Sequence, residues 1–356
     1  MPARASRNSR LALYLAAAYT LLVLYASLHP FAGWRDSGAD PLAFLAAAWP
    51  RYFTAFDLVV NTLAYLPLGL LWGAALLAWL PRSLVFLLVV LLGSGLSLGV
   101  ELTQNFLPSR VPSNLDLACN TLGVVLGALG ALHWGHALID GGRLHAWRER
   151  RFLRGRNGDI GLLLLALWFL TQLNPETFLF GTGNLRSLLG VAAPLPFEAG
   201  RFGEFEMATV AAHTLAIALI GSHLAANHPV LLPLALIAAG LAIKSFALML
   251  LIESLHGFAW ATPGTLGGLA LGLGLWGALF ALQRSSRVAI AALALMLAVV
   301  LANLMPDNPY LEHTLRVWQQ GHFLNFNGLT RTLSSLWPFL ALPWLMLSRN
   351  PHGHRH

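Results

Sequence analysis

Long apolar runs alternate with short polar connections along nearly the whole chain. A run of about 20 mostly apolar residues is long enough to cross a bilayer as a helix. The pattern therefore predicts an all-α, polytopic bundle of transmembrane helices. The ten predicted spans are 11–29, 57–80, 83–106, 115–137, 159–174, 206–226, 229–253, 262–282, 287–305 and 321–347.

Composition excludes a soluble protein. Apolar residues make up 57% of the chain and charged residues only 10%, whereas a soluble domain carries roughly 25% charged residues. The single cysteine, Cys119, leaves no possibility of an intrachain disulfide. The chain is thus expected to be an integral membrane protein.

The net charge of +7 has a topological explanation. Arginines gather at the N-terminus, in alternate connections and in the C-terminal tail, and most acidic residues lie in the opposite connections. The positive-inside rule then places both termini in the cytoplasm. The basic surplus consequently gives no indication of nucleic-acid binding.

Polar residues recur with one spacing in two parts of the chain. Asn61 begins the tetrad NTLA and His213 the similar tetrad HTLA, and a glutamate follows each by 40 residues, at Glu101 and Glu253. Three residues after each glutamate comes a hydrogen-bonding side chain, Gln104 or His256. We interpret this as a parallel duplication of a four-helix unit.

The duplication suggests four segments. These are a first four-helix unit (1–137), an Arg-rich cytoplasmic loop (138–158), a second four-helix unit (159–283), and a helix pair with a cytoplasmic tail (284–356). A partial third echo ends three outward-going spans, in the sequences SLHP (27–30), QLNP (172–175) and NLMP (303–306).

Ionisable residues inside apolar spans are costly and mark functional sites by default. Glu101 lies near the outer end of its predicted span, with Gln104 on the same helical face. The next span opens with Ser113 at a capping position and Asp116 in the first turn, where the helix dipole favours an acid.

The span after Asp116 continues with a stripe of small and polar residues. Asn120 lies one turn further on the same face, and Gly123 and Gly127 extend the stripe. Glycines four residues apart allow a transmembrane helix to approach another backbone closely. We expect a helix contact at these glycines.

The stretch combines LPLG at 66–69, the spacing E-x-x-Q at Glu101, Arg110, and the spacing D-x-x-x-N-T-L-G from Asp116. This combination resembles the VanZ family of membrane proteins, over residues 56–135. The family takes its name from a protein that confers resistance to the glycopeptide teicoplanin. The resemblance implies a bacterial cell-envelope protein of the cytoplasmic (inner) membrane. The positions that match the family motif are Asn61, Glu101, Gln104, Arg110, Asp116 and Asn120.

Two interpretations of these polar residues stay open. They could form a hydrogen-bonded knot that fixes the helices, or a ligand site in which Arg110 pairs with a carboxylate or binds a phosphate. Glu101, Arg110 and Asp116 are the candidates for any catalysis. The candidates for ligand binding in the rest of the chain are His213, Glu253, His256 and Arg331. The histidines are expected to be packed rather than metal-bound, and no metal or cofactor is predicted.

The leading hypothesis is a non-catalytic protein whose outward-facing polar pocket binds or remodels a lipid-linked cell-wall or polysaccharide component, with glycopeptide resistance as one possible role. Membrane lipids and such a precursor are the expected partners, and the oligomeric state is left open. One alternative is an intramembrane enzyme that uses Glu101 as a general base and Arg110 to bind phosphate. Another is a proton-coupled transporter of lipids or solutes that uses Glu101 and Glu253.

Overall fold

The computed structural model describes residues 10–36, 38, 40–50, 53–138, 143–251, 257–308 and 324–348. Within these ranges the chain forms helices and no strand, which confirms the all-α fold class. The chain divides into two compact units, Met1–Glu149 and Arg150–His356. Each unit is described by itself.

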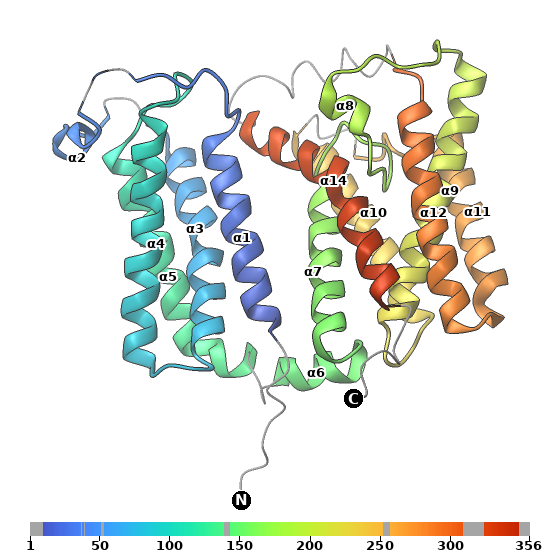
Figure 1. Ribbon diagram of the computed structural model, residues 1–356, viewed down its shortest axis with the longest axis horizontal. Helices are drawn as coiled ribbons and strands as arrows, with labels where there is room; N and C mark the ends of the chain where they lie inside the picture. Colours follow the sequence, from blue (N-terminus) through green and yellow to red (C-terminus); the bar gives the residue numbers. More distant parts are fainter. Residues whose placement is uncertain are drawn as a thin grey trace, which may run out of the picture. The chain divides into compact units, whose positions relative to one another are not determined.

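Four long helices form the first unit (Figure 1). They are α1 (Leu11–Leu28), α3 (Ala55–Leu76), α4 (Arg82–Gln104) and α5 (Asn114–Leu138), and the short α2 (Ala43–Ala46) lies in the connection after α1. A capping box between Thr54 and Asp57 starts α3. Helix α3 packs against α1, α4 and α5, so it is the centre of the unit.

The second unit surrounds one buried helix, α9 (Ala199–Leu224), whose most apolar stretch is 89% buried. Its neighbours are α7 (Gly155–Thr171), α10 (Leu231–Leu251), α11 (Pro263–Ala278) and α12 (Arg284–Leu304). Helix α14 (Leu324–Ser348) packs on α7 and α12. The remaining elements are α6 (Arg143–Arg151) at the boundary of the units, α8 (Leu185–Leu189) and the 3-10 turn η2 (Leu279–Ala281).

Eight helices in the described residues are long and apolar enough to cross a membrane. The chain is therefore a multi-helix membrane protein, but the count of ten spans is not confirmed. The predicted span 159–174 corresponds to α7, which has only 17 residues. The predicted span 321–347 corresponds to α14, which contains Arg331 and two prolines.

After α7 the chain leaves the helix and turns back into the second unit. Phe180 is fully buried against Trp168 of α7, and the backbone N–H of Thr182 donates to Nε2 of His213 at 3.0 Å. His213 lies 14 residues, about 21 Å, from the start of α9. Irregular backbone at that depth is tolerated only where protein surrounds it.

Backbone contact between α3 and α5 holds the first unit together. A Cβ atom on Gly123 would lie 2.2 Å from the carbonyl oxygen of Thr62, and one on Gly127 would lie 2.1 Å from that of Leu66. Only hydrogen atoms fit in that space. The close helix contact that the sequence predicts at Gly123 and Gly127 is therefore made with α3, at two positions one turn apart.

The second unit repeats this contact with the same residue spacing. Cβ atoms on Gly268 and Gly272 of α11 would lie 2.6 and 2.7 Å from the carbonyl oxygens of Met207 and Ala211 on α9. In both units the glycine follows its contacting residue by 61 positions. The pair α9 and α11 is accordingly the packing counterpart of α3 and α5.

We predict that Gly127→Ala lowers the free energy of unfolding by about 1 to 3 kcal/mol, because the added methyl overlaps backbone that cannot move independently. Gly95→Ala on α4 is the matched control, since a Cβ there meets nothing within 4 Å. Thermal unfolding in detergent compares the two variants. Equal melting temperatures for both would contradict the contact.

Candidate functional site

The polar residues of the first unit gather where α5 begins and α1 and α4 end. Glu101, on the last turn of α4, accepts a hydrogen bond from the backbone N–H of Ser113 at 2.9 Å. The Ser113 hydroxyl in turn accepts the N–H of Asp116 at 3.2 Å, which caps α5. A buried carboxylate therefore lies at the positive end of α5.

Arg110 and Gln104 bind the opposite kind of helix end. Nη2 of Arg110 donates to the carbonyl oxygens of His29 at 3.1 Å and Ala26 at 3.4 Å, and Nε2 of Gln104 donates to that of Ser27 at 2.9 Å. These are the last carbonyls of α1, which have no partner inside their helix. Arg110 thus joins α1 to the polar end of the unit.

Two further pairs connect α5 to its neighbours. Nδ2 of Asn61 on α3 donates to Oδ1 of Asp116 at 2.8 Å, and Nδ2 of Asn120 donates to the Ser97 hydroxyl on α4 at 2.9 Å. All six residues of the family motif therefore make contacts at one end of the first unit. We call Asn61, Ser97, Glu101, Gln104, Arg110, Ser113, Asp116 and Asn120 the polar cluster.

Two opposite charges of the polar cluster lie near each other without forming an ion pair. Arg110 and Glu101 interact electrostatically, but no ion pair joins them in the described part of the chain. Burial lowers the pKa of Arg110, and the Glu101 carboxylate opposes that shift. Burial and the neighbouring guanidinium both lower the pKa of His29. The Arg110 guanidinium therefore lies close enough to the Glu101 carboxylate to interact with it, but forms no ion pair with it.

Some polar atoms of the polar cluster lack a hydrogen-bond partner within the described part of the chain. Nε of Arg110 and Oδ1 of Asn120 are buried and have no partner among the described residues. Buried polar atoms without partners are rare in folded proteins and call for an explanation such as a bound water, ion or ligand. Both interpretations of the sequence stay open, because each of the two side chains also makes a hydrogen bond to a neighbouring helix through another atom.

Residues 6–135 match the family model VanZ/LLP1. The first unit is similar to the VanZ family over these residues and is called the VanZ-like unit. The match begins well before the motif-bearing residues 56–135 that suggest the family in the sequence, and it takes in α1. The VanZ-like unit therefore includes the helix whose carbonyls Arg110 and Gln104 bind. No curated protein and no solved structure matches the chain.

The other predicted ligand residues belong to the second unit or lie outside the description. His213 is buried in α9, with its ring bonded to Thr209 and Thr182. The Arg331 guanidinium on α14 donates to the carbonyl and hydroxyl oxygens of Ser187. Glu253 and His256 fall outside the described residues. Within the part that is described, no cluster of three or more His, Cys, Asp or Glu residues could hold a metal.

Glu206 is a further buried acid that the sequence pattern does not single out, because it lies at the edge of a predicted span. Its two carboxylate oxygens accept the hydroxyls of Thr262 at 2.7 Å and Thr265 at 3.1 Å, at the start of α11. The spacing of the glycine contacts makes α11 the counterpart of α5. Both units thus place a buried glutamate at the N-terminus of this helix, from α4 in the first and from α9 in the second. The four-residue repeat of Gly264, Gly268 and Gly272 was the available signal.

A second regularity involves the three tetrads that end in proline. The carbonyl oxygen of the residue before each proline accepts a hydrogen bond from a cationic side chain. His29 accepts from Arg110 at 3.1 Å, Asn174 from Lys244 at 2.6 Å, and Met305 from Arg186 at 3.2 Å. Proline cannot continue a helix, so these carbonyls are left without helical donors. A cation near the negative end of a helix is also electrostatically favourable.

Lys244 is the most buried of these three cations. Its ammonium group is almost completely buried and donates to the carbonyl oxygens of Asn174 and Thr177, both at 2.6 Å. It therefore reaches the segment after α7 instead of water. This contact fixes the start of the segment that turns back toward His213.

We predict that Lys244→Met lowers the free energy of unfolding by about 2 kcal/mol or more, because two buried carbonyls lose their donor. Phe246→Met is the control on the same helix, since Phe246 is 59% exposed and faces the surroundings of the unit. Thermal unfolding in detergent measures both. If the melting temperature of Lys244→Met equals those of Phe246→Met and wild type, the ammonium group does not hold the segment.

Proposed function

We propose that the VanZ-like unit binds the polar head group of a lipid-linked cell-wall or surface-polysaccharide component at the polar cluster. The observation that carries the proposal is the pair of buried, unpartnered atoms, Nε of Arg110 and Oδ1 of Asn120. One is a charged donor and the other an acceptor. A ligand that satisfies both needs an acceptor, for which an anionic group suits the guanidinium best, and a hydroxyl or amide donor.

A phosphate that carries a sugar has this chemistry. The guanidinium of Arg110 presents its donors in a planar fork that suits phosphate oxygens. The amide oxygen of Asn120 can accept a hydroxyl hydrogen. Oε2 of Glu101 is engaged by Ser113, which leaves Oε1 to orient a second hydroxyl. The polar cluster thus offers complementary groups for a head group and holds them on rigid helix ends.

Topology supports an outward-facing site. Arg4, Arg7 and Arg10 precede α1 and favour a cytoplasmic N-terminus. The polar cluster lies at the other end of α1, where this helix finishes at Leu28. In this orientation the site faces the outer leaflet, where lipid-linked precursors of the cell wall are used. Binding or remodelling such a precursor is compatible with the resistance phenotype that gave the family its name.

Arg110→Gln and Asn120→Leu are expected to weaken binding of a polyprenyl phosphate sugar to the purified full-length protein in nanodiscs. Loss of a charged hydrogen bond predicts at least about a tenfold rise in Kd for Arg110→Gln, and loss of a neutral one predicts about fivefold for Asn120→Leu. Arg201→Gln is the control, because it removes the same charge from an exposed residue of the second unit.

Unchanged Kd values for both polar-cluster variants, with both variants folded, would contradict the proposal. Turnover of the bound lipid that is lost in Glu101→Gln while binding is retained would instead identify the unit as an enzyme. The same titrations measure both outcomes.

A further inference from the structure

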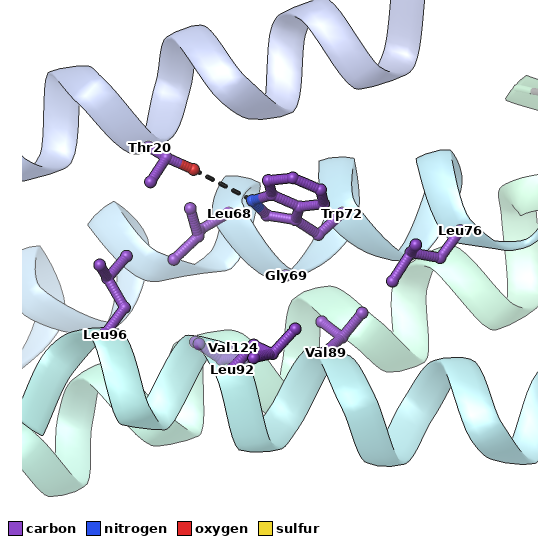
Figure 2. A pocket seen from close by; sticks show the side chains of 10 residues that line it. Thr20, Leu68, Gly69, Trp72, Leu76, Val89, Leu92, Leu96 and Val124 are labelled. Carbon is purple, nitrogen blue, oxygen red and sulfur yellow. Dashed lines mark hydrogen bonds between the residues drawn. The ribbon is translucent and has the colours of Figure 1, made fainter.

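An apolar slot lies directly next to the polar cluster in the VanZ-like unit (Figure 2). It has a volume of about 170 Å³ and lies between α1 and α4, over α3 and α5. Apolar cavities of roughly 150 Å³ stay dry and accept hydrocarbon groups. The slot is formed by Thr20, Leu68, Gly69, Trp72, Leu76, Val89, Leu92, Gly93, Leu96 and Val124.

The two polar side chains of the slot are occupied with each other. The indole N–H of Trp72 donates to the Thr20 hydroxyl at 3.0 Å, the contact drawn in Figure 2, and that hydroxyl donates to the carbonyl of Ala16 at 2.8 Å. An occupant therefore finds no free donor on these walls. Water needs two to four polar partners to reside in a cavity, so the chemistry of the slot favours hydrocarbon.

The dimensions of the slot suit an extended chain. Its α4 wall runs from Val89 to Leu96, seven residues or roughly 10 Å along the helix. Leu92 in this wall is 66% exposed, so the slot opens sideways on a surface of the unit. All four helices that form it are apolar and long enough to span a membrane. In a bilayer such helices are bordered by hydrocarbon, so a lipid chain is the occupant that suits this opening.

On three helices, residues that line the slot lie within about one turn of the polar cluster or of its contacts. Asn120 lies one turn before Val124 on α5, and Ser97 follows Leu96 on α4. On α3, the buried Tyr65 lies one turn before Gly69, with its hydroxyl near Ser97. The Val124 end of the slot is therefore about one helical turn from Asn120, whose amide oxygen has no partner among the described residues.

We propose that the slot holds one hydrocarbon chain of the same lipid whose head group binds the polar cluster. This inference rests on the proposed function and adds the lipid class, because a head group held at Asn120 and Arg110 brings its first chain atoms to the slot. The protein then recognises both parts of the lipid. The hydrocarbon chain inserts between α1 and α4, and the head group binds near the C-terminal end of α1.

A photoreactive polyprenyl phosphate sugar, with a diazirine near the start of its chain, tests the slot in the full-length protein. Irradiation is expected to label peptides of α3 and α4 that line it. Leu92→Trp and Leu96→Trp fill the slot and are expected to raise the Kd by about tenfold and to reduce labelling in proportion. Leu91→Trp is the matched control, since Leu91 is 59% exposed and does not line the slot.

The outcomes separate the slot from the head-group site. Wild-type binding by both slot-filling variants, while Arg110→Gln binds weakly, would overturn the slot and leave the proposed function standing. Normal binding by Arg110→Gln with weak binding by the slot-filling variants would support the slot and contradict the head-group site. Equal labelling by a phosphatidylcholine with the same diazirine would also overturn the inference, because the slot would then hold any bilayer chain.

Discussion

Backbone carbonyls at the ends of transmembrane helices need donors, and hydrocarbon provides none. In this protein a cation supplies the donor after α1, α7 and α12, through Arg110, Lys244 and Arg186 respectively. Each cation contacts the residue just before a proline. The remaining polar structure is arranged around these contacts. In the VanZ-like unit, the arginine that satisfies α1 also places positive charge beside the glutamate that caps α5.

The two units solve a common packing problem with different side chains. Both bring two helices into backbone contact through glycines that follow their contacting residues by 61 positions. Both place a glutamate at the N-terminus of the glycine-bearing helix, but from different neighbours. In the VanZ-like unit, Glu101 accepts the Ser113 N–H on Oε2, whereas Glu206 accepts a hydroxyl on each of its carboxylate oxygens. The two glutamates are therefore not equivalent in what they can still bind.

Much of the fold could be predicted from the sequence because lipid imposes simple rules. Apolar length predicted the helices, the spacing of Gly123 and Gly127 predicted a close contact, and Ser113 with Asp116 predicted the cap of α5. Partner identity could not be predicted in this way. Arg110 stands between two carboxylates in the sequence, yet its partners are carbonyls of α1. The return of residues 172–184 into the second unit depends on Lys244 and His213, which lie far away in the chain. Nothing in local periodicity reports such tertiary contacts.

A high-resolution map of the protein in a lipid nanodisc, with a polyprenyl phosphate sugar added, tests the account most directly. Head-group density is expected within hydrogen-bonding distance of Nε of Arg110 and Oδ1 of Asn120. That density should continue as a chain into the slot beside Trp72 and Leu92. A well-resolved map in which both atoms bind other side chains of the protein, and no lipid reaches them, would contradict it.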